Sequence, residues 1–335
     1  MEILNDIQKQ ISSRHSRVGG NPGFIAPTLD PRICEDDDSI HYQYENAGGV
    51  NVLRQKEGIE ITVESEVNAI FEFSSEIKNE GSDSIFILAK ENSVLHIFEN
   101  VKSDTAVSFE RKIFITVEKG AKVIFAEIAN LQQGSSLILH KSSKVFADGK
   151  MEWYDLHAGA ETVHSFTEDT LAENGAESSS CVLAISSEEK FEIHNIIHHE
   201  ADNTTSHIFA RGIAGGNGKI IYRALSDIKK GISGATGRQD GRFLITGSGA
   251  EIDAIPSLDI ASSESNSSHA ISISHLAEKD FFYPALRGIA PYRAQAMLLS
   301  GFLTKHLEKL PENWQSKFTE KINKKLSSPL FRMGE

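Results

Sequence analysis

Short hydrophobic runs recur along the chain between about Val50 and about Leu276, and each is rich in Val, Ile and Phe. Examples are IEITVES, AIFEFS, KVIFAEI and KIIYRAL, and most are bounded by Gly, Ser, Asn or Asp. Runs of about 4–7 such residues are typical of β-strands. The spacing of three or four residues that marks an amphipathic helix is nearly absent from this region. The pattern therefore predicts an all-β region built from many short strands.

Similar glycine-containing corners separate several of these runs. They stand at Gly120-Ala121, Gly134-Ser135, Gly175-Ala176 and Gly249-Ala250. A β-propeller, a large β-sandwich and a β-solenoid all fit this number of strands. The corners are irregular in length and repeat without a WD or Gly-aromatic blade motif, which favours the solenoid.

The run KVIFAEI illustrates the alternation expected in a parallel β-helix. Val123, Phe125 and Glu127 fall on one face of this run, and the residues between them fall on the other. In a solenoid, one face of each strand points to the apolar interior and the other to solvent. We therefore expect a polar, exposed outer face on each strand.

The pattern changes after Leu276, where two helices are predicted. Pro291 is suited to the first turn of a helix, and Pro311 ends that helix. One face of the first helix carries Ala294, Met297, Leu298, Gly301 and Phe302, and the second carries Trp314, Phe318, Ile322 and Leu326. We accordingly divide the chain into an N-terminal appendage of a short helix and a loop (1–45), a β-helix (46–278) and a C-terminal helical domain (279–335).

Composition limits the kinds of partner. The 335 residues include 47 acidic and 34 basic side chains, a net charge of −13, which argues against nucleic acid or a membrane surface as the partner. Cys34 and Cys181 are the only cysteines, so a disulfide framework or a zinc finger is not expected. The sequence has no apolar run of membrane-spanning length, and its first residues lack a secretory h-region. We expect a cytoplasmic protein.

Catalytic signatures are missing from the sequence. It has no GxSxG, P-loop or HExxH motif, and the glycines of GIAGGNGK precede a strand rather than a helix. In one alternative, Asp253, Asp259 and Arg242 would line a groove, as in a β-helix carbohydrate-active enzyme of the polysaccharide lyase kind. Solvated strand faces explain these three residues equally well.

Four histidines lie within fourteen residues, at His194, His198, His199 and His207. FEIHNIIHH places His194 and His198 on the same side of a strand. Imidazole clusters bind transition metals, so these are secondary metal candidates. The alternative is that they are exposed or hydrogen-bonded histidines without a metal.

A collinear series of motifs between about Asn217 and Leu310 resembles the SufD branch of the SufB/SufD family, which assembles iron–sulfur clusters. The matching elements, in order, are Gly218-Lys219-Ile220, Leu244-Ile245, Gly249-Ala250-Glu251, Pro256 with Leu258-Asp259-Ile260, Ser268-His269, Phe282-Tyr283, Arg287-Gly288-Ile289 and a helix ending in Gly301-Phe302. Each element is weak alone, but their order and spacing make the resemblance specific.

The resemblance implies a right-handed parallel β-helix with a C-terminal helical domain. It also implies a non-catalytic subunit that pairs with a SufB-like scaffold and docks a SufC-like ATPase. The implied β-helix junction includes Leu244, Ile245 and Pro256, and the implied ATPase surface includes Phe282, Tyr283, Arg287, Gly288, Ile289 and Phe302. No tightly bound cofactor is expected, only transient iron or a nascent cluster in the complex. Because strand edges pair readily, we expect some homodimer when the chain is isolated.

His269 is the residue that the resemblance assigns to cluster assembly, as a ligand or iron relay at the junction. The competing interpretation is a histidine that only holds the junction together. Ser267 stands where the family often has a cysteine, and Ala270 replaces a glycine. With two cysteines in all, the chain resembles SufD more than a thiolate-bearing SufB. A plain structural β-solenoid, the last alternative, would not need the terminal helices.

Overall fold

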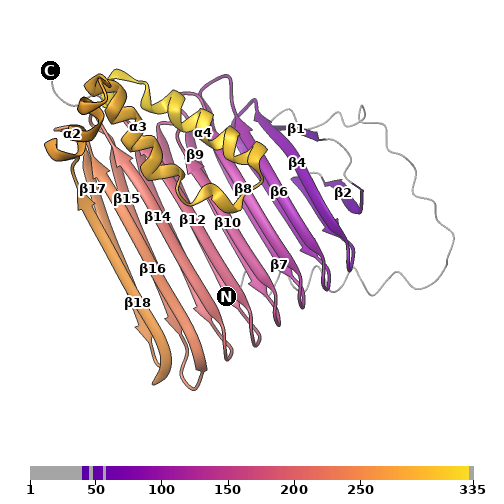
Figure 1. The fold of residues 1–335 in the computed structure, drawn as a ribbon. Helices are drawn as coiled ribbons and strands as arrows, with labels where there is room; N and C mark the ends of the chain where they lie inside the picture. Colours follow the sequence, from indigo (N-terminus) through magenta and orange to yellow (C-terminus); the bar gives the residue numbers. More distant parts are fainter. Residues whose placement is uncertain (1–39, 45–47, 56–57, 332–335) are drawn as a thin grey trace, which may run out of the picture. The chain divides into compact units, whose positions relative to one another are not determined.

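The computed structural model describes residues 40–44, 48–55 and 58–331, in which eighteen strands form two nine-stranded sheets (Figure 1). Sheet A contains, in spatial order, β1 (Ile40–Tyr44), β4 (Asn68–Ile77), β6 (Val94–Lys102), β8 (Lys122–Asn130), β10 (Lys150–His157), β12 (Glu177–Ser186), β14 (Thr205–Ala214), β16 (Ser233–Ile245) and β18 (Glu264–Ser274). Sheet B contains β2 (Val50–Gln55), β3 (Gly58–Val63), β5 (Gly81–Ala89), β7 (Ser108–Val117), β9 (Ser136–Val145), β11 (Thr162–Leu171), β13 (Lys190–His199), β15 (Lys219–Ile228) and β17 (Glu251–Ile260).

From β3 onward the chain alternates between the two sheets, and from β5 onward each strand pairs in parallel with the strand two places earlier. The predicted β-solenoid is therefore confirmed, with about eight turns. Only β1 with β4 and β2 with β3 pair antiparallel among the described strands. β1 lies before residue 46, inside the range assigned to the N-terminal appendage; residues 1–39 lie outside the described residues.

The strands are longer than the hydrophobic runs that predicted them. β9 covers SLILHKSSKV, so it continues past the apolar SLILH through a polar segment. Both halves pair in register with β7 and β11. Backbone hydrogen bonds between stacked coils do not depend on side-chain hydrophobicity, which is why the polar half is also a strand.

Glycines at the corners stack on polar side chains of the preceding coil. Gly120, Gly175 and Gly234 all have a positive φ, and a Cβ at each would lie 2.3–2.4 Å from the side-chain oxygen of an Asn or Asp. For Gly175 that oxygen is Oδ1 of Asp148, which itself has a φ of 55°. The corners therefore require glycine for both backbone conformation and space.

Helices cover the outer face of sheet A (Figure 1). They are α2 (Glu278–Leu286), α3 (Pro291–Thr304) and α4 (Glu312–Leu326), with short 3-10 turns at Leu307–Lys309 and Pro329–Phe331. Pro291 opens α3 as predicted, and α2 is an additional helix. No helix in the described ranges is long and apolar enough to cross a membrane.

The expectation of a polar outer face is wrong for β8. Val123 and Phe125 point inward as predicted, but Ala126 and Ile128 on the other face are also buried. They pack in a second hydrophobic cluster with Trp314 of α4. Both faces of sheet A are apolar here because α4 packs on the outer face and excludes solvent from it.

Charged side chains also lie inside the solenoid. Glu99, Glu127 and Asp155 occupy aligned positions on β6, β8 and β10. From sheet B, Arg111 forms an ion pair with Glu99, and Lys141 lies 2.5 Å from an oxygen of Asp155. Glu127 has no hydrogen-bond partner in the described part of the chain, and burial, reinforced by the two neighbouring acids, raises its pKa to about 8. Glu127 is therefore largely protonated at neutral pH.

A pair of glycine substitutions separates backbone strain from steric overlap at the corners. Gly231 has a φ of +84°, and a Cβ there would meet nothing within 4 Å, whereas Gly175 faces Asp148. Gly231→Ala should lower the free energy of unfolding by about 1 kcal/mol through strain alone. Gly175→Ala should lower it by at least about 1 kcal/mol more because of the overlap. Equal losses in urea denaturation would contradict the stacked-corner explanation.

Protonation of Glu127 predicts a pH dependence of stability. The folded-state pKa of Glu127 lies above its unfolded value, so the folded chain retains a proton that the unfolded chain loses between about pH 4.5 and 8. The free energy of unfolding should fall across that window with a contribution of up to about 1.4 kcal/mol per pH unit. In Glu127→Gln this part of the slope should disappear, while the half-buried control Glu110→Gln on β7 should keep it. An unchanged slope in Glu127→Gln, measured by urea denaturation at several pH values, would show that the carboxyl group is ionised.

Candidate functional site

The last coil of the solenoid, β17 and β18, ends the two sheets (Figure 1). In the interior of the stack, alternate residues of a strand are covered by the next coil. On β17 and β18 most side chains are exposed or half-buried, including the apolar Ile255 and Ile273. This end therefore combines unpaired strand edges with side chains of the kind found in the core.

His269 lies on β18 at this end. It is aligned with Gln239 of β16, which is buried and donates hydrogen bonds to Ser226 and to the carbonyl of Ser257. His269 thus continues an inward-facing column, but its side chain is exposed. Within the described residues, its imidazole has no hydrogen-bond partner. An imidazole side chain is able to bind a transition metal.

The three residues predicted for the β-helix junction lie on two strands. Leu244 and Ile245 belong to β16, which is flanked by β14 and β18, so this strand is not an edge. Leu244 is also buried in the cluster beneath the helices, which removes its side chain from an end-to-end contact. Pro256 lies on the edge strand β17. The hydrophobic pattern could not distinguish an internal strand from the final one.

The predicted ATPase surface is mostly exposed. Phe282 and Tyr283 of α2 are 67% and 64% exposed, and Arg287 lies over the Tyr283 ring at 5.4 Å. Gly288 ends the α2 segment with a φ of +70°. Phe302 is half-buried and packs against the cluster beneath the helices.

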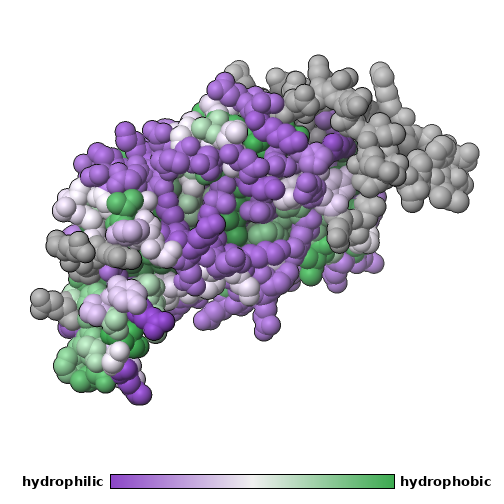
Figure 2. All heavy atoms as spheres, turned by 90° about the horizontal axis from the view of Figure 1, so that it is seen from above, coloured by the Kyte–Doolittle hydropathy of each residue, from purple (hydrophilic) through white to green (hydrophobic). Residues whose placement is uncertain are grey.

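Further apolar side chains extend this surface. Leu286, Tyr292 and Met297 are each at least 60% exposed. A cavity of about 650 Å³ beside them is lined by Ile289, Ala296, Leu299 and Phe331, among others. Figure 2 shows a hydrophobic patch at the end of the molecule where α2 lies in Figure 1. A continuous exposed apolar surface of this kind is typical of a protein-binding site.

The four clustered histidines do not converge. His194 and His198 lie on the outer side of sheet B, while His199 is buried and bonded to Thr204 and Ser206. Burial lowers the pKa of His199 to about 4, so its imidazole is neutral. His207 lies on β14 in sheet A. No group of three or more His, Cys, Asp or Glu side chains that could hold a metal is found among the described residues.

His198 has a structural environment of its own. Its two ring nitrogens lie 2.9 Å from Glu168 and 2.8 Å from Asp227, on the neighbouring strands β11 and β15. Hydrogen bonds to these carboxylates raise the pKa of His198 above its usual value, against the effect of burial. The residue therefore links three coils as a cross-strand bridge.

The cysteine that the structure describes is not a thiolate. Cys181 is buried beneath the helices, and burial raises the pKa of its thiol to about 12. Cys34 lies outside the described residues. Cys181 therefore offers no accessible soft ligand for iron.

The three residues considered for a carbohydrate-active enzyme lie on two different sheets. Arg242 lies on β16 of sheet A, whereas Asp253 and Asp259 lie on β17 of sheet B. Asp253 is paired with Arg223 of the adjacent strand at 2.5 Å. These acids and this arginine therefore lie on different sheets.

Comparison with known proteins agrees with the resemblance noted in the sequence. Residues 73–302 match the family model described as SUF system FeS cluster assembly, SufBD core domain. A Staphylococcus aureus (strain MRSA252) protein named as an iron–sulfur cluster assembly SufBD family protein is 26% identical over 256 residues, covering 75% of this chain and 55% of the relative. A Staphylococcus saprophyticus protein of the same description is 25% identical over the same length and with the same coverage.

This chain spans about half the length of these curated relatives. The family match extends from β4 in the first coils into α3, so it includes most of the β-helix and the start of the helical region. With more than half of its residues in that match, the chain belongs to the SufBD family of iron–sulfur cluster assembly proteins.

Proposed function

We propose that this chain is a SufD-like, non-catalytic subunit of a SufBCD-type complex, which pairs with a SufB-like scaffold and docks a SufC-like ATPase. It would act in the cytoplasm and support iron delivery and cluster formation at the subunit junction. The observation that carries this proposal is the last coil of the solenoid, where His269 is exposed on the edge strand β18. The apolar surface of α2 and α3 lies on the elements that directly follow that coil.

The edges of β17 and β18 support pairing with another β-helix. Strand edges offer unpaired backbone N–H and C=O groups, which a partner strand can complete. Exposed apolar residues on both strands, such as Ile255 and Ile273, would be buried by such a partner. We therefore assign the SufB-like junction to β17 and β18 rather than to Leu244 and Ile245. The same edges would allow a homodimer when the chain is isolated.

His269 would serve as the metal-handling residue at this junction. An imidazole binds and releases iron without redox chemistry of its own. Because Cys181, the cysteine within the described residues, is buried as a thiol, we propose that the soft thiolate that a cluster needs comes from the partner. Iron or a nascent cluster is then cargo at the junction, not a resident cofactor of this chain. In this proposal His269 supplies an imidazole and the partner supplies the thiolate, which corresponds to a SufD-like rather than a SufB-like role.

The exposed apolar surface of α2 and α3 supports the docking of a protein such as the ATPase. Phe282, Leu286 and Met297 each expose more than half of their surface. Aromatic and methionine side chains are enriched in protein interfaces, where a partner protein covers them. The cavity at Ile289 and Phe331 would receive a side chain of the partner. A plain structural solenoid would give no reason for this surface.

Charged substitutions on α2 test the ATPase surface. Phe282→Asp combined with Leu286→Asp should reduce co-purification of the SufC-like ATPase at least about tenfold, because a docked interface would bury both charges. Thermal unfolding of the chain should be nearly unchanged, since both side chains are about two-thirds exposed. Leu53→Asp on β2, which is 55% exposed at the other end of the solenoid, is the matched control. Co-purification at the wild-type yield would remove this surface from the proposal.

His269→Ala tests the proposed metal role. The complex should assemble with its ATPase but accumulate little iron and acid-labile sulfide, because the exposed imidazole is lost while the backbone of β18 is kept. His164→Ala, at an exposed histidine on sheet B, should leave the cluster content unchanged. Normal iron and sulfide in His269→Ala would contradict the ligand role. Failure of the complex to assemble would instead indicate a histidine that only holds the junction together.

A further inference from the structure

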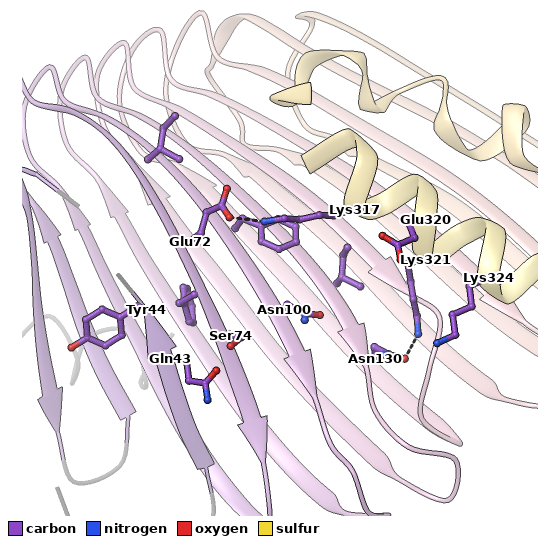
Figure 3. Close-up of a pocket in the computed structure, with 14 residues that line it drawn as sticks. Gln43, Tyr44, Glu72, Ser74, Asn100, Asn130, Lys317, Glu320, Lys321 and Lys324 are labelled. Carbon is purple, nitrogen blue, oxygen red and sulfur yellow. Dashed lines mark hydrogen bonds and ion pairs between the residues drawn. The ribbon is translucent and has the colours of Figure 1, made fainter. Parts of the chain in front are cut away.

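A groove runs between α4 and the outer face of sheet A, where β1, β4, β6 and β8 lie (Figure 3). Its volume is about 980 Å³, which falls within the range of small-molecule sites. Its lining includes no residue of β17, β18 or α2, so it is separate from the proposed junction and ATPase surface.

The groove exists because α4 covers only part of the sheet. Trp314 and Phe318 pack on Phe98 and cover the sheet there. On β4 the start of α4 reaches Glu72 but leaves Ile70 uncovered, so that Ile70 remains 56% exposed. The result is a trough with the helix as one wall and the strands as its floor.

Glu72 fixes the end of this trough near the start of α4. It accepts hydrogen bonds from Asn313 (2.8 Å), Trp314 (2.5 Å) and Lys317 (2.5 Å). Burial alone would raise the pKa of Glu72, but these donors hold it below its usual value. Glu72 is thus ionised and already neutralised by Lys317, so this end has no charge to offer a ligand.

The other end has positive charge without a counter-ion. Lys321 contacts the side-chain oxygen of Asn130, and in the described part of the chain it has no carboxylate partner. Lys324 lies beside it in Figure 3 and has no ion-pair partner among the described residues, whereas Lys325 pairs with Glu189. Burial and the two neighbouring lysines lower the pKa of Lys321 to about 8. An anion at this position would offset the repulsion between the lysines and stabilise the charged form of Lys321.

The floor of the trough is suited to the rest of a small ligand. The side-chain amide of Asn130 lies beside Lys321, and Asn100 lies farther along the floor on β6 (Figure 3). Tyr44, Phe98 and Ile128 add apolar surface. Glu320 also lines the wall and forms no ion pair in the described ranges. It disfavours a long polyanion, and the net charge of −13 disfavours one further.

We propose that this groove binds a small anion with phosphate or carboxylate groups, held by Lys321 and Lys324, with the amides of Asn100 and Asn130 as additional donors. Lysine is a competent point-charge ligand for such groups, and a partly water-excluded cleft strengthens the contact. This site goes beyond the proposed role in cluster assembly, since it shares no residue with the junction or the ATPase surface.

Calorimetric titration of the full chain at low salt with inorganic phosphate, pyrophosphate and citrate tests the proposal. At least one probe should bind with a Kd below about 1 mM, and pyrophosphate and citrate distinguish a phosphate from a carboxylate ligand. Lys321→Met, which keeps the alkyl packing, should weaken binding at least about tenfold, as expected for one desolvated charge contact. Lys122→Gln removes the same charge from the opposite end of β8 and should leave the affinity unchanged.

A second readout follows from the proton on Lys321. Because a bound anion raises the lowered pKa of Lys321, binding at about pH 8.5 should take up protons, seen as a heat that depends on the buffer's ionisation enthalpy. That uptake should be absent in Lys321→Met. Folding of each variant is checked by thermal unfolding, and Lys324→Gln provides a second variant at an exposed position. The proposal is overturned if no probe binds at millimolar concentration, or if Lys122→Gln weakens binding as much as Lys321→Met.

Discussion

In-register stacking of parallel coils is the constraint on which the rest of this structure depends. Each residue lies directly over its counterpart one coil earlier, so side chains form columns along the solenoid. The rings of Phe125 and Trp153 lie 5.5 Å apart in one interior column, and those of His140 and Phe166 stack at 5.2 Å on the outer side of sheet B. A shift of one residue would exchange inner and outer faces on a whole strand. The corners must therefore keep the register, which is why glycines there stack on Asn and Asp side chains.

Stacking also explains the charges inside the solenoid. When one coil carries an acid at an inward position, the next coil places its own side chain directly over it. Glu99, Glu127 and Asp155 stack in this way; Lys141 pairs with Asp155, and Arg111 is shared between Glu99 and the buried Asp83 of β5. No cation is left to pair with Glu127 in the described part of the chain, and Glu127 is protonated because an unpaired ionised carboxylate in this interior would be too costly.

The helices give the two sheets different roles. Sheet B keeps a half-exposed outer face, whereas α4 converts the outer face of sheet A into a second hydrophobic cluster around Trp314 and Phe318. Where α4 stops covering the strands, the lysine-lined trough opens. Where the coils stop, the inward-facing column that would otherwise be covered ends in the exposed His269. Both candidate sites therefore lie where packing ends. The trough lies beside α4 on the outer face of sheet A, and His269 lies on the last coil of the solenoid.

The order of strands and corners was determined by the sequence, because short Val, Ile and Phe runs with glycine corners specify a local conformation. The helix carrying Trp314, Phe318, Ile322 and Leu326 was equally visible, and all four residues are buried as its spacing predicted. The motif series around His269 pointed to the family, which the match over residues 73–302 confirms.

Tertiary structure alone decided which strand is the edge, which face α4 covers and whether the clustered histidines converge. β16 and β18 have similar local patterns, yet one is internal and the other terminal, because pairing depends on how many coils follow. His194, His198, His199 and His207 are close in sequence but point to different faces, since adjacent strand residues alternate and successive strands belong to different sheets. Lys321 and Asn130 are 191 residues apart in sequence, and only the packing of α4 on sheet A brings them into contact.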